Sequence, residues 1–430
     1  SLLPGGTITR DFEITSSLQT TTDGKLPVVL DTFVVTSARE GNAKAIMNQR
    51  GSMDITNSIA SDVFGDVAEG NVGEFLKHMP GVELDLVQGE ARTVRLRGLA
   101  SEYTAVTLDG MSLASADANQ GASGNARAFS FEQVSLSSMD SIEVSKTVSA
   151  DVDANAPAGT INLKTKRAFD RTGRRVTLQA NVTAYSARFN FDNSYGPDDR
   201  KSRKIHPGGI FDYSDVFFNK RLGINLNISE SMIYSANMRA IVTYSYTPTT
   251  ADPRPVVPTA LTFTDAPRTN RRSTVNFTAD YSATPRLVLS LGLLYNYAAL
   301  NNPQRQLAFN SGSRTTVLGA DSLTSFSTSS TAANVVSNPL AIVKLGQTIT
   351  VRPRFEYRVG NLTVEGRFGA SESISWYDSL GSQGSIRDVG SPTLTGLKYT
   401  ASRSSVRSGD WKITQTAGPD MADGANYASP

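Results

Sequence analysis

The stretch of sequence that decides the fold is VTLQANVTAY, residues 176–185. Apolar side chains occupy every second position, and Thr, Gln and Asn fill most positions between them. Successive side chains of a β-strand point to opposite faces, so this stretch predicts a strand with one apolar and one polar face. The pattern recurs through the second half of the chain, at 222–228, 236–246, 275–281, 287–297, 349–357 and 362–370, and more weakly at 397–401 and 411–416.

The connections between these strands alternate in length. Tight turns are predicted at 229–231, 283–285 and 359–361, and long polar loops at 186–220, 247–272 and 299–347. A compact soluble domain rarely carries several such loops, whereas short turns at one end and long loops at the other are typical of an outer-membrane barrel. Residues 169–430 therefore predict about eight or nine strands of an antiparallel transmembrane β-barrel. A soluble β-sandwich remains the alternative.

The region before these strands has a different texture. Val72, Phe75, Leu76 and Met79 lie on one face of a helix that Asn71 can cap, with Glu74 placed for a capping box and Pro80-Gly81 ending it. Short apolar runs follow, and a second helix is expected from Ser130 with Gln133 in its first turn. Residues 46–168 therefore predict a small α+β domain, in a chain that is mainly β.

Composition excludes several classes of function. The formal net charge is +2, and the one short basic run, 200–204, is expected to be a solvated loop, so we expect no nucleic-acid partner. The chain has no cysteine and two histidines, which excludes thiol nucleophiles, disulfides and cysteine-rich zinc sites. We find no paired carboxylates typical of glycosidases, no nucleophile elbow and no phosphate loop. We expect no catalytic residue, no cofactor and no metal.

Five motifs of the α+β region resemble the plug of TonB-dependent receptors. They are NVGEFLKHMPGV (71–82), VRLRG (94–98), YTAVTLDG (103–110), IEVSK (142–146) and APAGTINLKTK (156–166). The longer form DVDANAPAGTINLKTK, residues 151–166, is similar to receptors associated with carbohydrate uptake. The resemblance implies a plug that fills a large barrel and a substrate that binds on its outer side.

The resemblance also implies a partner, TonB of the inner-membrane energy-transducing complex. DTFVVTSA resembles the TonB box, and its β-branched residues suit an added strand on a partner's sheet edge. We expect residues 1–26 to be the tail of an upstream domain and a linker, and 27–45 to be the box segment. The alternative is a strand of that upstream domain. The residues of the expected box are Asp31, Thr32, Phe33, Val34, Val35, Thr36, Ser37 and Ala38.

The motifs suggest residues that gate the plug and residues that contact substrate. Arg97-Gly98 matches the family's Arg-Gly motif. An arginine in a polar lumen can bond a barrel carboxylate, and the alternative is a solvated charge at the end of a strand. Gly98 and Gly110 suit turns with positive φ, and Asp109 can cap its turn. Glu143 can pair with a basic group at the plug–wall contact, or be an exposed charge on a half-buried strand. Candidate substrate contacts in outward loops are Tyr103, Asn119, Gln120, Asn125 and Arg127.

The leading hypothesis is a receptor of the outer membrane of a Gram-negative-type bacterium, with outer-membrane lipid around it. It would actively take up an extracellular carbohydrate or ferric siderophore too large for porins. Eight strands enclose only their own side chains, and plugged transporters have about 22, so we expect the barrel to be incomplete at its C-terminal end, with an open sheet edge. The alternatives are an outer-membrane adhesion protein without energy coupling and a soluble β-rich polysaccharide-active enzyme.

Overall fold

The structure is a computed structural model of the chain. It describes residues 42–51, 55–60, 71–87, 90–118, 127–147, 156–170, 173–195, 201–321, 323–329, 331–379, 382–383, 387–388 and 390–428. The expected TonB-box residues, Asp31 to Ala38, lie outside these ranges.

The first part of the described chain is an α+β domain around a five-stranded sheet of order β1-β6-β7-β4-β5. β4 and β7 are parallel, and the other pairs are antiparallel. A separate hairpin, β2–β3, lies outside this sheet. The elements are α1 (Asn42–Gly51), β1 (Thr56–Ala60), α2 (Val72–Leu76), β2 (Val82–Val87), β3 (Glu90–Leu96), η1 (Ser101–Tyr103), β4 (Thr104–Leu108), β5 (Met111–Ser112), η3 (Leu136–Ser138), β6 (Met139–Ser145) and β7 (Gly159–Thr165).

Helix α2 starts as the sequence predicts. The Asn71 side chain caps it by accepting a hydrogen bond from the Gly73 amide, 2.8 Å away. The capping box is wrong, because the Glu74 carboxylate accepts instead from the amide of Ala91 on strand β3, at 3.1 Å. The second helix is also wrong, because the chain from Ser130 forms turns and then the single 3₁₀ turn η3.

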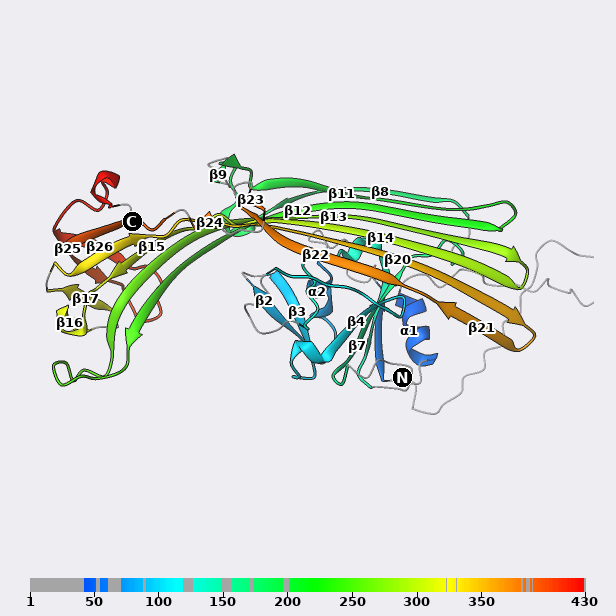
Figure 1. The fold of residues 1–430 in the computed structure, drawn as a ribbon, viewed down its shortest axis with the longest axis horizontal. Helices are drawn as coiled ribbons and strands as arrows, with labels where there is room; N and C mark the ends of the chain where they lie inside the picture. Colours follow the sequence, from blue (N-terminus) through cyan, green and yellow to red (C-terminus); the bar gives the residue numbers. More distant parts are fainter. Residues whose placement is uncertain are drawn as a thin grey trace, which may run out of the picture. The chain divides into compact units, whose positions relative to one another are not determined.

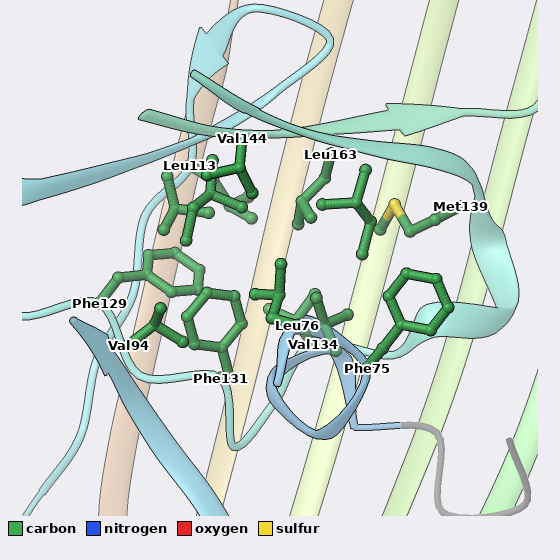
Figure 2. Packing of buried hydrophobic residues seen from close by; sticks show 14 of the residues in the cluster. Phe75, Leu76, Val94, Leu113, Phe129, Phe131, Val134, Met139, Val144 and Leu163 are labelled. Atoms are coloured by element: carbon green, nitrogen blue, oxygen red, sulfur yellow. The ribbon is translucent and has the colours of Figure 1, made fainter. Parts of the chain in front are cut away.

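The apolar residues of this domain form one core, shown in Figure 2. Phe75 and Leu76 of α2 pack with Phe131 and with the inward residues of β6 and β7, all at most 2% exposed. Burying each such side chain stabilises the fold by about 1.5–3 kcal/mol. Leu294, a residue of the large sheet described next, is part of the same core, so the two parts share apolar contacts.

The second part of the chain is a fifteen-stranded sheet whose described neighbouring strands are antiparallel. Figure 1 shows its long strands running side by side. We call eight of them the wall: β8 (Arg175–Ala184), β11 (Ile205–Phe217), β12 (Leu222–Ser245), β13 (Val257–Thr284), β14 (Leu287–Asn301), β20 (Val343–Val359), β21 (Leu362–Arg367) and β22 (Ala370–Ser379).

Shorter elements continue this sheet or lie between the long strands. They are η4 (Ser186–Arg188), β9 (Ser194–Tyr195), β10 (Lys201–Ser202), β15 (Arg305–Asn310), η6 (Arg314–Thr316), β16 (Val317–Asp321), β17 (Ser325–Thr328), β18 (Ala333–Ser337), β19 (Leu340–Ala341), β23 (Ser382–Gln383), β24 (Arg387–Asp388), β25 (Thr393–Ser402), β26 (Lys412–Ala417) and η7 (Gly424–Asn426).

The strands run longer than the alternation predicts. The turns near 284–287 and 359–362 are confirmed, but the turn expected at 229–231 is wrong, because β12 continues unbroken along β13 to Ser245. The alternation breaks there because the apolar face turns polar at Glu230 and Arg271, which form an ion pair. Strand β11 lies within 186–220, which was expected to be a loop. The Pro-Gly-Gly sequence at 207–209 interrupts the alternation that would have predicted this strand. Its tight turn to β12 is 217–222.

The two faces of the wall differ in polarity. One cross-strand row, Leu226, Phe277, Leu293 and Val351, lies on the outward face, where Leu293 and Val351 are 39% and 37% exposed. The next row, Asn227, Asn276, Leu294, Thr350 and Ser371, lies on the inward face, where Asn227 and Asn276 are fully buried. Exposed apolar and buried polar side chains are the reverse of a soluble sheet. No helix among the described residues is long and apolar enough to span a membrane.

A second apolar core lies where β13 begins. Val257 and Leu261 of β13 pack with Phe309, Phe326 and Tyr399 from β15, β17 and β25. The aromatic rings of these three strands meet edge to face, with centroids 5.8–6.1 Å apart. This region, which we call the outer lobe, was expected to be loop in large part (299–347). Short strands of four to six residues, too brief to show alternation, hide it from sequence analysis.

Candidate functional site

The α+β domain bonds to the inward face of the wall at several places, and the first is a buried ion cluster around Glu90. Arg272 of β13 donates to the Glu90 carboxylate at 2.6 Å, and Asn270 donates to both of its oxygens at 2.7 and 2.8 Å. Arg268 pairs with the same carboxylate and also donates to the Val87 carbonyl at 3.0 Å. The Arg272 and Arg268 side chains are only 1% and 6% exposed, so Glu90 supplies a counter-charge that water cannot.

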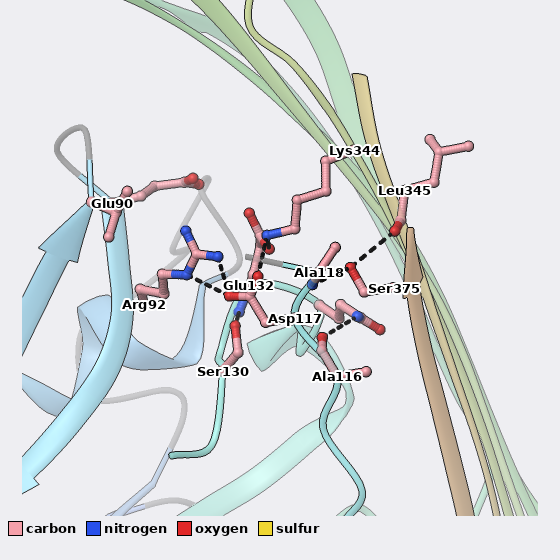
Figure 3. Close-up of polar contacts among 12 residues, drawn as sticks. Glu90, Arg92, Ala116, Asp117, Ala118, Ser130, Glu132, Lys344, Leu345 and Ser375 are labelled. Carbon is pink, nitrogen blue, oxygen red and sulfur yellow. Dashed lines mark hydrogen bonds and ion pairs between the residues drawn. The ribbon is translucent and has the colours of Figure 1, made fainter. Parts of the chain in front are cut away.

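The second cluster centres on Lys344 of β20, whose side chain reaches toward Asp117 and Glu132 in Figure 3. Its ammonium group lies 2.7 Å from the Asp117 carboxylate. Arg92 of β3 pairs with the other side of Asp117. The side chains of Lys344, Asp117 and Glu132 are 8% exposed or less, so their charges are screened little by solvent.

The third contact is a ladder of serine hydroxyls on β22. Ser371, Ser373 and Ser375 point inward and accept hydrogen bonds from alternate amides of the segment 114–118. The donors are the amides of Ala114, Ala116 and Ala118, at 3.1, 3.0 and 3.1 Å. In an extended segment every second amide points the same way, and in a strand every second side chain does. The alternate amides of 114–118 therefore match the alternate serines of β22 in three successive hydrogen bonds.

Two further ion pairs tie the first β-sheet to the wall. Arg352 of β20 pairs with Asp109, which also accepts from the Thr165 amide at 2.9 Å. Lys166 lies 3.0 Å from Asp212 of β11 and also donates to the Ser137 carbonyl at 3.1 Å. With the exception of Lys166–Asp212, the pattern is constant: the α+β domain supplies the acid and the wall supplies the base.

The ion clusters shift the pKa values of the acids that they hold. Burial raises the pKa of Glu90, but the positive charges of Arg272 and Arg268 more than offset this and lower it from 4.5 to about 2. Burial opposes ionisation of Asp117 too, and the bonds from Arg92 and Lys344 lower its pKa. Glu90 and Asp117 are therefore ionised at neutral pH. No three His, Asp or Glu side chains gather to hold a metal in the part of the chain that the structure describes.

Comparison with known proteins gives a family for the α+β domain. Residues 48–160 match the family model of the TonB-dependent receptor plug domain. The chain carries a TonB-dependent receptor plug. The resemblance inferred from the sequence is therefore confirmed, as is the mainly β fold with an antiparallel sheet after the plug. A search of curated proteins gives no match.

Several solved structures are similar to the chain at low identity. The ferric enterobactin receptor PfeA of Pseudomonas aeruginosa is 11% identical, with 81% of this chain and 55% of that chain covered and a TM-score of 0.42. The ferric citrate transporter FecA is 10% identical, with 84% and 62% covered and a TM-score of 0.32. The siderophore receptor PirA of Acinetobacter baumannii is 13% identical, with 86% and 60% covered and a TM-score of 0.33. The chain thus spans less than two thirds of the length of these receptors.

The five expected gating residues lie in two different environments. Asp109 contacts the wall through Arg352, and a Cβ on Gly110 would come within 2.9 Å of Arg367. Gly98 and Gly110 have φ of 74° and 81°, as their turns require. Arg97 does not reach a barrel carboxylate in its described contact, because its guanidinium donates to the Pro157 carbonyl of the plug at 3.2 Å. Glu143 pairs with Lys164, also of the plug.

The expected substrate contacts are only partly described. Asn119, Gln120 and Asn125 lie outside the described residues. Tyr103 is 46% exposed at the end of η1, and Arg127 lines a hollow of about 410 Å³ together with Glu102, Ser112 and Ser115. Charged and hydroxyl groups in this hollow can hydrogen-bond a polar ligand.

Sequence reasoning missed several of the acidic side chains that bond the plug to the wall. Glu90, Asp117 and Glu132 belong to none of the motifs quoted above. A usable signal was present on the wall, where Arg352 occupies a polar-face position of a predicted strand. Such a position faces the interior of a barrel, where a charge requires a partner.

The serine ladder can be tested by removing its three acceptors together. The substitutions Ser371→Ala, Ser373→Ala and Ser375→Ala are expected to destabilise the seating of segment 114–118 by about 3 kcal/mol, since each hydrogen bond contributes about 1 kcal/mol. Hydrogen exchange at the three alanine amides should accelerate correspondingly. Glu372→Ala, on the exposed face of the same strand, is the matched control. Equal exchange in both variants would exclude a fastening role.

Proposed function

We propose that this chain is the plug and part of the barrel of an outer-membrane receptor that takes up its substrate actively, with energy delivered through TonB. One observation supports this most directly: the wall bonds the plug through its buried polar face and leaves its apolar face exposed. An apolar outer face suits lipid, and a polar inner face suits a lumen that a removable plug can occupy.

The height of the apolar face agrees with a bilayer. On β14 the outward residues run from Leu289 to Tyr297, a stretch of nine residues and about 27 Å along the strand at about 3.4 Å per residue. A tilted transmembrane strand needs about 9–11 residues. The apolar band of an outer-membrane barrel is about 25 Å tall and is flanked by aromatic residues. Here Tyr281, paired with Leu289, and Tyr297 lie at the two ends.

A charge in the middle of this face tests the membrane assignment. Leu293→Arg is expected to lower the free energy of unfolding in lipid vesicles by about 2–4 kcal/mol, because a charged group near the bilayer midplane is costly. Leu362→Arg, at the tight turn after β20, should cost about 0–1 kcal/mol near the interface. Equal, small effects, together with recovery of the chain without detergent, would favour a soluble β-rich protein.

Energy coupling is proposed from the sequence of residues 31–38. A β-branched segment before the plug can add a strand to the edge of a TonB sheet, and its main-chain hydrogen bonds would bear a pulling force. The ion clusters described above are the bonds that such a force would have to break. We propose that TonB pulls the plug away from the bases of the wall, opening a passage for the bound substrate.

Deleting Asp31 to Ala38 in the full receptor is expected to abolish uptake and preserve surface binding. The probes are radioiron-labelled ferric enterobactin and ferric citrate, and a fluorescent oligosaccharide series. These arms also separate the two substrate classes, since the sequence resembles carbohydrate-associated receptors and the solved relatives are named for ferric chelates. A deletion of equal length within residues 15–24 is the control. Uptake that survives the first deletion would indicate a binding or adhesion protein instead.

A further inference from the structure

An exposed aromatic pair lies beyond the end of the apolar face of β8. Leu178 and Val182 on that strand are 81% and 71% exposed. Seven and nine residues after Val182, Phe189 and Phe191 are 61% and 87% exposed, and their rings meet edge to face with centroids 5.9 Å apart. Leaving two phenyl rings in water is unfavourable, and exposed apolar surface of this kind marks a contact site.

Basic side chains lie where the chain re-enters the sheet, next to the end of β8. Ala184, the last residue of β8, pairs with Ile205, the first residue of β11, so the residues just before Ile205 leave the sheet where β8 ends. These include Lys201, Arg203 and Lys204. The ammonium group of Lys204 donates to the Asn190 side chain at 2.7 Å, which places the basic residues beside the two phenylalanines. From residue 189 to residue 204 the sequence has four basic and three acidic residues, so this segment carries a net charge of +1.

We propose that Phe189, Phe191, Lys201, Arg203 and Lys204 bind a phosphorylated glycolipid of the outer leaflet. The inference rests on the proposed function. β8 ends at the opposite end of β11 from the tight turn at 217–222, and in an outer-membrane barrel the tight turns lie on the periplasmic side, so this end of β8 lies at the outer surface. The phenyl rings pack on acyl chains at the height where aromatic belts lie, and the cations donate charge-assisted hydrogen bonds to the phosphate groups. A free phosphate ion would meet the cations but leave the rings uncovered.

The test compares lipids that differ only in phosphate. The full chain in detergent micelles is mixed with bisphosphorylated lipid A or with its dephosphorylated form, and bound lipid is measured by native mass spectrometry. The wild type should prefer the phosphorylated lipid on the order of a hundredfold, from three cations near an anionic surface. Lys201→Gln, Arg203→Gln and Lys204→Gln together should remove the preference. The matched control removes three cations elsewhere: Lys398→Gln, Arg407→Gln and Lys412→Gln.

The aromatic part has its own readout. Phe189→Ser with Phe191→Ser should weaken both lipids by the same factor and leave the preference for phosphate intact. Equal affinity of the wild type for the two lipids, loss of the preference in the control, or competition by inorganic phosphate that removes all lipid binding would each overturn the proposal. Its failure is distinguishable from that of the membrane assignment, because Leu293→Arg tests the latter without any added lipid A.

Discussion

Glu90→Gln is expected to loosen the plug from the wall by about 3–5 kcal/mol, because it removes the carboxylate that pairs with both Arg268 and Arg272 and leaves Arg268 with the more distant Glu132, at 3.9 Å. The amide keeps the size of the carboxylate, so the packing of β3 changes little. The effect should appear as cleavage of the plug by protease at lower urea concentration. The strand ladder of the wall, β12 to β14, should unfold at an unchanged concentration.

A neighbouring carboxylate provides the control for this variant. Glu83, on the same β-hairpin, has a side chain that is 57% exposed and lies 4.0 Å from Arg95. Because exposed ion pairs contribute about 0–1 kcal/mol, Glu83→Gln should leave the protease pattern nearly unchanged. Equal sensitivity of the two variants would mean that the Glu90 cluster does not fasten the plug.

The contribution of Glu90 should also depend on pH in a defined direction. Its pKa is lowered in the folded state to about 2 from 4.5, so its stabilisation is complete above pH 4.5 and is lost as the pH falls toward 2. The difference between wild type and Glu90→Gln should therefore shrink across this window. Pepsin can replace a neutral protease for the acidic part of the series. A constant difference down to pH 2 would contradict the assignment.

Gly159→Ala is expected to destabilise the plug by about 2–5 kcal/mol, through backbone strain and overpacking together. Gly159 begins β7 with φ of 128°, and a Cβ there would lie 2.3 Å from the Ser145 carbonyl oxygen of β6. The two strands must separate to admit it. Hydrogen exchange of the β6 and β7 amides measures the loss.

Gly98→Ala is the control that separates the cost of backbone strain from the cost of the contact with Ser145. Gly98 also has a positive φ, 74°, but a Cβ there meets nothing within 4 Å. Gly98→Ala should therefore cost only about 1–2 kcal/mol, the left-handed conformation alone. If the two variants lose equal stability, the contact with Ser145 is not the cause.

Elements were predicted correctly where the polarity of each residue matches the exposure of its position in the fold. Val176 to Ala184 alternates because one face of β8 is exposed and the other faces inward, and Asn71 caps α2 because its side chain fits the first turn. The pattern failed where a strand passes between environments. β13 runs from the outer lobe, past the plug, to the turn at Thr284, and each environment demands a different side chain on the same face.

The plug–wall contacts could not be predicted as pairs. Asp109 was among the expected gating residues through its motif, but its partner Arg352 is 243 residues away in the chain. Glu90 carries no motif, since only the approach of β13 gives it three donors. A charge on the inward face of a strand signals that a partner exists, and the three-dimensional fold alone decides which one.

The spacing of these partners along the chain has a consequence for biogenesis. The Glu90 cluster joins residues 182 apart, Lys344 and Glu132 are 212 apart, and the serine ladder joins residues 257 apart. Contacts so distant form late, since long loops must close first. Most residues of the plug core are synthesised before the wall. The wall residues that bond the plug follow one strand at a time, β13 before β20 and β20 before β22. A chaperone that binds the growing chain would therefore meet the plug segment before the strands that fasten it have been synthesised.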